Sequence, residues 1–172
     1  VAATGARVYN PGGRRGGVAG RGRAGAGRAA GPAVPETAST RPNPCVPKQW
    51  YLAANHTYDA WPDPPTLAPV RIAILDSGVD GGHPELAGRI VAAKSFVGGS
   101  ARVDLEGHGT FVAGLIAAEV DDGIGTAGSF PSAELVIAKI GTAQGTIPEL
   151  AEARAIRAAV SGHARVIKMS LR

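Results

Sequence analysis

The sequence predicts an α/β fold built on a mostly parallel sheet. Short runs rich in branched apolar residues, each long enough for one buried strand, recur at 70–75, 89–96, 134–140 and 165–171. Two stretches with helical spacing lie between them, one opening at His108 and one following Thr146. Strands that alternate with helices along a chain are typical of parallel sheets covered by helices.

The first 41 residues differ in composition from the rest. They are rich in Gly, Ala and Arg, and residues 1–40 carry six arginines and one acidic residue. A segment with so little to bury does not offset its ordering entropy, so we expect 1–41 to be a disordered leader or linker and 42–172 to be the folded domain. An RNA-binding tail is the alternative, but such tails interleave aromatic residues for stacking, and only Tyr9 is present.

Composition excludes several classes of function for the folded part. The positive charge of the chain, +4, comes from the leader, and the remainder is nearly neutral, which argues against a nucleic-acid partner. No apolar run reaches the roughly 18 residues that span a bilayer, and no signal peptide is visible at the start. The single cysteine, Cys45, allows neither an internal disulfide nor a Cys/His metal cluster.

Residues 41–52 are expected to form an extended arm. Several prolines restrict its conformation, and Trp50 and Tyr51 are expected to anchor it on the domain. The G-I-G-T-A-G sequence at 123–128 fits a dinucleotide-binding fingerprint in letters only, because it follows a helix and leads into a strand.

A candidate catalytic acid and base stand at the ends of two predicted elements. Asp76 ends the first strand, and ligands of open α/β sheets bind at the carboxyl ends of the strands. His108 opens a helix between two glycines, which leave room for a close approach to the backbone. The helical spacing predicts a buried face made of Phe111, Val112, Leu115 and Ile116.

The last third predicts a helix and a strand. Thr146 and Glu149 have the spacing of a capping box, with proline at an allowed early position. The helix should bury Leu150, Ala153, Ile156 and Val160 and end at Gly162.

Four blocks in order, I-L-D-S-G-V-D at 74–80, H-P-E-L-A-G at 83–88, G-H-G-T-F-V-A-G at 107–114 and V-I-K-M-S-L at 166–171, resemble those of the subtilisin-like serine peptidases, peptidase family S8. The resemblance begins near residue 42. It implies a three-layer sheet with helices on both faces, Asp76 and His108 as catalytic residues, and the chain order Asp, His, Ser.

The family places its serine in a G-T-S-x-x-P block, and no such block occurs in these 172 residues. We therefore expect the N-terminal part of a serine endopeptidase domain, truncated before the helix of the nucleophile and inactive by itself. The resemblance also implies a polypeptide substrate, an extracellular location and a monomer, with no membrane or nucleic-acid partner.

The same resemblance implies further site residues. Substrate-binding positions correspond to Gly145, Ser170 and Leu171. A structural calcium ion is the one cofactor implied, with Asn43, Glu85 and Asp122 as candidate ligands, although Asn43 stands where an aspartate is usual.

Two other functions stay open on the sequence. One is a degenerate relative that keeps the scaffold for binding. The other is a metal-dependent hydrolase that uses Asp76, Asp80, His83 and His108. Asp104 and Glu106 lie nearer to His108 in the sequence than Asp76 does, but the resemblance assigns the acid to Asp76.

Overall fold

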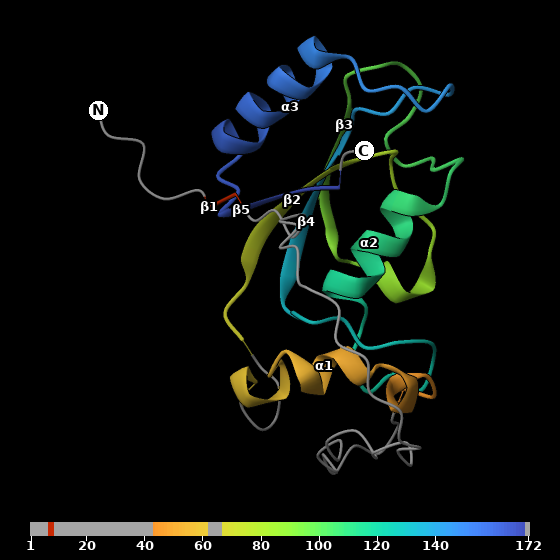
Figure 1. Ribbon diagram of the computed structural model, residues 1–172, viewed down its shortest axis with the longest axis vertical. Coiled ribbons are helices and arrows are strands. Elements are labelled where there is room, and N and C mark those ends of the chain that lie inside the picture. The colour runs from red at the N-terminus through yellow and green to blue at the C-terminus, as the bar shows by residue number, and fades with distance from the viewer. Residues whose placement is uncertain (1–6, 9–42, 62–66, 171–172) are drawn as a thin grey trace, which may run out of the picture.

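The computed structural model describes residues 7–8, 43–61 and 67–170. Its centre is a five-stranded sheet in the order β1-β5-β2-β4-β3, in which every neighbouring pair is parallel (Figure 1). The strands are β1 (Arg7–Val8), β2 (Val70–Asp76), β3 (Ile90–Ser95), β4 (Ala133–Lys139) and β5 (Val166–Met169). The four predicted strands are therefore present, within about two residues of the expected ends.

Within the predicted leader the structure describes only Arg7–Val8, which form the short edge strand β1. The rest of the segment 1–41 lies outside the described residues.

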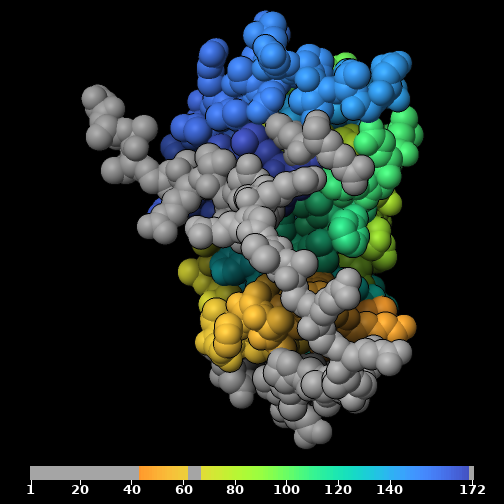
Figure 2. Space-filling model, in the orientation of Figure 1, coloured from red at the N-terminus to blue at the C-terminus, as the bar shows by residue number. Residues whose placement is uncertain are grey.

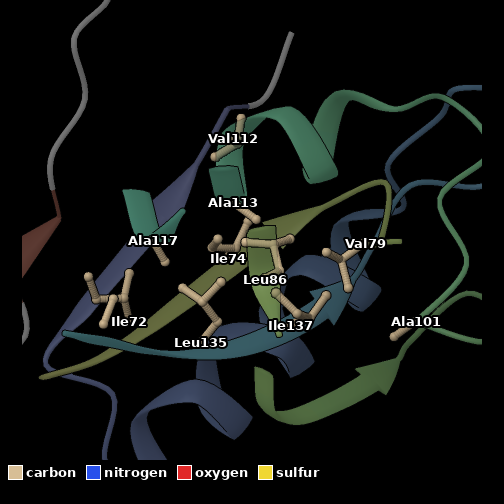
Figure 3. Close-up of a cluster of buried hydrophobic side chains, with 11 residues drawn as sticks. Ile72, Ile74, Val79, Leu86, Ala101, Val112, Ala113, Ala117, Leu135 and Ile137 are labelled. Atoms are coloured by element: carbon tan, nitrogen blue, oxygen red, sulfur yellow. The ribbon is translucent and has the colours of Figure 1, made fainter. Parts of the chain in front are cut away.

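Two helices cover opposite faces of the sheet because side chains of a strand alternate between its faces. Ile72 and Ile74 of β2 join one buried cluster with residues of α2 (His108–Ala117), which Figure 3 shows. Ala73 and Leu75 join a second cluster with α3 (Glu149–Ser161). The three layers implied by the resemblance are confirmed.

The buried face of α2 differs from the predicted one. Phe111 is 63% exposed, whereas Val112, Ala113 and Ala117 are buried with Gly109. Gly109, Ala113 and Ala117 recur every four residues, and their small side chains let the helix approach the sheet closely. Val112 is buried as predicted and Ile116 packs against the same cluster, but Phe111 is not buried, and the other close contacts are made by the smallest side chains.

The same error affects α3. Leu150 and Val160 are 60% and 48% exposed, and the buried positions are Ala151, Ala155 and Ala159. The capping box is also absent: Pro148 takes the cap position, and the hydroxyl of Thr146 pairs with that of Thr142. The helix ends before Gly162, as predicted.

The arm after residue 42 is helical rather than extended. It contains η1 (Val46–Lys48), α1 (Trp50–Ala54) and η2 (Tyr58–Ala60), and it lies at the end of the molecule opposite α3 (Figures 1 and 2). Trp50 is 72% exposed, so Leu52 and Gln49, both buried, hold the arm instead. The last short helix, η3 (Pro84–Leu86), follows the turn after β2.

Candidate active site

Strand parity aims Asp76 at the layer that contains α2. Asp76 is the last residue of β2 and follows Ile72 and Ile74 on the same face of the strand. Its side chain is only 4% exposed. A carboxylate at this depth needs hydrogen-bond donors, because burial without them strongly disfavours its charge.

His108 supplies one of these donors. It is the first residue of α2, and its Nδ1 lies 2.7 Å from Oδ1 of Asp76. An ionised carboxylate only accepts hydrogen bonds, so Nδ1 carries the proton and Nε2 keeps a free lone pair. The imidazole is 42% exposed, which leaves Nε2 within reach of a reacting group.

The backbone around Asp76 adds to this arrangement. The amide of Ser77 donates to Oδ1 of Asp76 at 2.8 Å, while Oδ2 is buried without a hydrogen-bond partner among the described residues. The amides of Ile140 and Gly141 donate to the carbonyl oxygen of Asp76 at 2.9 and 3.3 Å. These two backbone hydrogen bonds hold the carboxyl end of β2 against the segment that follows β4.

A cavity of about 250 Å³ opens over the pair. The residues that line it are Asp76, Ser77, Glu106, His108, Gly141, Gly145, Ile147 and Ser170. Two of the predicted substrate-binding residues, Gly145 and Ser170, thus share one cavity with the imidazole. The third, Leu171, lies outside the described residues.

The described residues give no support to the metal-hydrolase hypothesis. Within the described ranges no three His, Cys, Asp or Glu side chains are grouped so that they could hold a metal ion. Asp76 and His108 are instead occupied with each other.

Asn43 lies against a cluster of oxygen atoms, here called the ring, from the loop between α2 and β4. Its Nδ2 is within 3.2 Å of four acceptors, namely the carbonyl oxygens of Glu119, Ile124 and Thr126 and Oδ1 of Asp122. An amide nitrogen has two hydrogens, so Nδ2 cannot satisfy all four of these acceptors, although Oδ1 of Asp122 also accepts the amide of Ile124 at 3.0 Å.

The ring also carries negative charge. Glu85 is buried, and its Oε2 has no hydrogen-bond partner among the described residues. Burial, and then the charge of Asp122, raise the pKa of Glu85. The oxygens and the two carboxylates, Glu85 and Asp122, suit a hard cation such as calcium, whereas Asn43 turns its Nδ2 toward them. The Oδ1 of Asn43 now accepts the amide of Asp121 at 2.6 Å, so the carboxamide has to turn before this oxygen could face an ion.

Sequence reasoning missed Ser77, Asp104 and Gln49 as structural parts of these sites. Gln49 exchanges two hydrogen bonds with the backbone of Ala127, at 2.8 and 2.9 Å. For Ser77 and Asp104, the only signal in the sequence is nearness to the predicted catalytic residues. Ser77 follows Asp76, and Asp104 precedes His108 by four residues.

Residues 68–172 match the model of the subtilase family, Peptidase_S8. The chain belongs to the subtilase family. Among curated relatives, this subtilase is 34% identical over 139 residues to the thermophilic serine proteinase of Bacillus sp. (strain AK1), an alignment that covers 78% of the chain and 34% of the relative. It is also 37% identical over 102 residues to thermitase of Thermoactinomyces vulgaris, covering 59% of the chain and 37% of thermitase.

A third relative matches over a shorter stretch, at higher identity. The major intracellular serine protease of Bacillus subtilis (strain 168) is 45% identical over 76 residues, which cover 41% of this subtilase and 24% of that protein. The chain thus spans about a third of the length of the first two relatives. In the described part of the subtilase, no helix has the length and apolar character needed to cross a bilayer.

Proposed function

We propose that this chain carries the acid and the base of a serine endopeptidase. The observation that supports the proposal is the 2.7 Å contact between Nδ1 of His108 and Oδ1 of Asp76, with a half-exposed imidazole facing a cavity. The family and the names of the relatives, which are serine proteases, agree with this reading.

The contact provides the chemistry that such a reaction needs. Nε2 of His108 takes the proton of a serine hydroxyl as its oxygen attacks the peptide carbonyl, and the buried carboxylate of Asp76 stabilises the imidazolium that forms. The imidazolium then gives this proton to the leaving amine as the C–N bond breaks, leaving an acyl-enzyme. Water, deprotonated by the same imidazole, releases the acid and restores the serine.

The substrate in this proposal is a polypeptide in an extended conformation. Ser170 follows the end of β5 and Gly145 lies in the turn after Thr142, so both stand at the carboxyl edge of the sheet beside His108. Leu171 is included among the substrate-binding residues only because it matches such a position in the family. We assign the protein a monomeric form and an extracellular location on the same resemblance, although one relative is by name intracellular.

The 172 residues contain no G-T-S-x-x-P block, so we propose that they hydrolyse no peptide by themselves. In subtilisin, a member of the same family, loss of the serine costs roughly a millionfold in turnover. The acid and base alone therefore provide no useful rate.

Calcium is the proposed structural ion. Glu85 and Asp122 would hold it with the neighbouring carbonyl oxygens and the amide oxygen of Asn43, and its charge would offset that of the two carboxylates. The ion would tie the arm to the loop between α2 and β4 and takes no part in the proposed reaction.

A chimera tests the function. The chain is joined to the part of thermitase that lies downstream of the matched residues. We expect hydrolysis of a chromogenic peptide that a serine-directed inhibitor blocks. His108→Ala should lower turnover roughly a millionfold and Asp76→Asn roughly ten-thousandfold, the magnitudes known from subtilisin and related peptidases.

Glu106→Gln is the matched control, because Glu106 lines the same cavity and the change also removes one charge. It should retain activity within about tenfold. A folded chimera that cleaves nothing, or one whose activity survives His108→Ala, would contradict the proposal and favour a non-catalytic scaffold. The isolated chain provides a second check, since hydrolysis by it would refute its proposed inactivity.

A further inference from the structure

A second carboxylate stands beside the pair and is not used by the proposed reaction. Asp104 accepts five hydrogen bonds. Its Oδ1 accepts from the hydroxyl of Ser77 at 2.8 Å and from the amides of Glu106 and Gly107 at 3.2 and 3.0 Å. Its Oδ2 accepts from the amide and the hydroxyl of Thr110, at 2.8 and 2.6 Å. Both oxygens are saturated, so Asp104 does not compete with Asp76 for the imidazole.

The hydroxyl of Ser77 lies between the two carboxylates. Its Oγ is 2.8 Å from Oδ1 of Asp104 and 3.2 Å from Oδ1 of Asp76. A hydroxyl has one hydrogen, and the shorter distance assigns it to Asp104. The Oγ in turn accepts the amide of Gly109 at 3.0 Å. Ser77, the residue after Asp76, is thus hydrogen-bonded to Gly109, the residue after His108.

Asp104 also replaces the missing cap of α2. The cap position is Gly107, which has a φ of +78° and no side chain to offer the free amides of the first turn. The carboxylate of Asp104 takes the amides of Gly107 and Thr110 instead, and its charge is favourable at a helix N-terminus. The start of the helix, and with it the position of His108, is fixed from outside the helix.

The direction of the Thr110 hydroxyl supports this arrangement. Its oxygen accepts the amide of Asp80 at 2.8 Å, so its hydrogen is free for Oδ2 of Asp104. Burial by itself would raise the pKa of Asp104, but the hydrogen bonds from Thr110, Ser77 and Gly107 outweigh it and lower the pKa below the ordinary value of 3.8. The carboxylate is therefore ionised, and it accepts hydrogen bonds only.

We propose that Asp104 is a positioning residue for the pair formed by Asp76 and His108. It draws the Ser77 hydroxyl away from Asp76 and fixes the first turn of α2, so that Nδ1 of His108 stays directed at Oδ1 of Asp76. This inference rests on the proposed function for its catalytic meaning, but the contact that it explains exists whether or not the chain takes part in hydrolysis.

The test measures that contact directly. In the 172-residue chain labelled with ¹⁵N-histidine, the Nδ1 proton of His108 should give a strongly downfield NMR signal that exchanges slowly with water. Asp104→Asn should abolish the signal. An asparagine presents an NH₂ group to the amide or the hydroxyl of Thr110, or to Ser77, so at least one of these hydrogen bonds is lost.

Glu106→Gln is again the matched variant. It removes one negative charge from the same loop, but Glu106 is exposed and its side chain takes no part in the hydrogen bonds to Asp104. The signal should survive this change. Equal loss in both variants would show that charge alone matters, and a signal that persists in folded Asp104→Asn would also overturn the proposal.

Ser77→Ala keeps the inference testable if Asp104→Asn does not fold. It leaves the contacts of Asp104 with Thr110 and Gly107 in place, and it removes the hydroxyl that bonds to Asp104 and accepts the amide of Gly109. We expect the Nδ1 proton signal to be lost, and a retained signal overturns the proposed link. Because the signal does not depend on peptide cleavage, failure here is distinguishable from failure of the chimera to hydrolyse substrate.

Discussion

A β-carbon placed on Gly109 would stand 2.0 Å from the carbonyl oxygen of Gly78. Gly109 is the second residue of α2, and Gly78 lies two residues beyond Asp76 at the end of β2. The helix therefore touches the end of the strand backbone to backbone. The glycines beside His108 are predicted to leave room for a close approach to the backbone, and the group that approaches Gly109 is the chain's own carbonyl group.

Gly109→Ala should separate the helix from the strand. Backbone atoms have to move to accept the new methyl group, and we expect a loss of about 3 kcal/mol in the free energy of unfolding together with loss of the His108 Nδ1 proton signal. Urea unfolding and NMR measure the two effects.

Gly114→Ala is the control in the same helix. A β-carbon there meets nothing within 4 Å, and alanine is the better helix former. Stability should stay the same or rise by up to about 1 kcal/mol. If both variants behave alike, the close contact is not what fixes the helix.

Lowering the pH should reduce the free energy of unfolding, in part through protonation of Asp104. Its pKa is lower in the folded state than the ordinary 3.8, so its stabilising contribution is fully present above pH 3.8 and is lost as the pH falls through the lower, folded-state value. In Asp104→Asn, the free energy of unfolding should fall less steeply than in the wild type as the pH is lowered below 5. Urea unfolding at several pH values measures this slope. Glu106→Gln should keep the wild-type slope, and an unchanged slope in Asp104→Asn would contradict the assignment.

Calcium should raise the melting temperature, and Asn43→Asp should increase the effect. A ligand at a hundred times its Kd stabilises the folded state by about 2.7 kcal/mol. In EDTA the variant should melt below the wild type, because a third carboxylate joins Glu85 and Asp122 without an ion.

Asn55→Asp makes the same change at an exposed position of the arm and should leave the calcium response unaltered. Scanning calorimetry with calcium, magnesium and EDTA compares the three chains. If calcium changes the melting temperature of neither the wild type nor Asn43→Asp, the proposed cation site is refuted.

Gln49→Leu should loosen the arm. The leucine fills the space but leaves the amide and the carbonyl of Ala127 buried without partners, at about 1 to 3 kcal/mol for each group. Gln144→Leu, at an exposed position, should change stability by less than about 0.5 kcal/mol. Equal effects in urea unfolding would show that the arm is not held by this pair of hydrogen bonds.

Much of this protein could be predicted from local patterns. Branched apolar runs located the four main strands, and the position of Asp76 at the end of one strand and His108 at the start of a helix marked the site. These features depend on residues adjacent in the chain, whose preferences for strand, turn and helix are set locally.

The faces of both helices could not be predicted in this way. Leu150 and Phe111 are more apolar than the alanines that are buried, but the separation between helix and sheet is set by contacts between distant segments, such as Gly109 with Gly78. Small side chains at the contact allow the layers to approach, and the sequence does not show which face meets the sheet.

By itself the sequence determined the fold class and the family, and it predicted Asp76 and His108 as the acid and the base. Only the tertiary structure decided that Asp104 accepts its hydrogen bonds from Ser77 and from the first turn of α2, and that Ser77 donates its amide to Asp76 and its hydroxyl to Asp104. The physical reason is geometric: hydrogen bonds act over about 3 Å, and which donors come within that range of an oxygen depends on how separate elements pack.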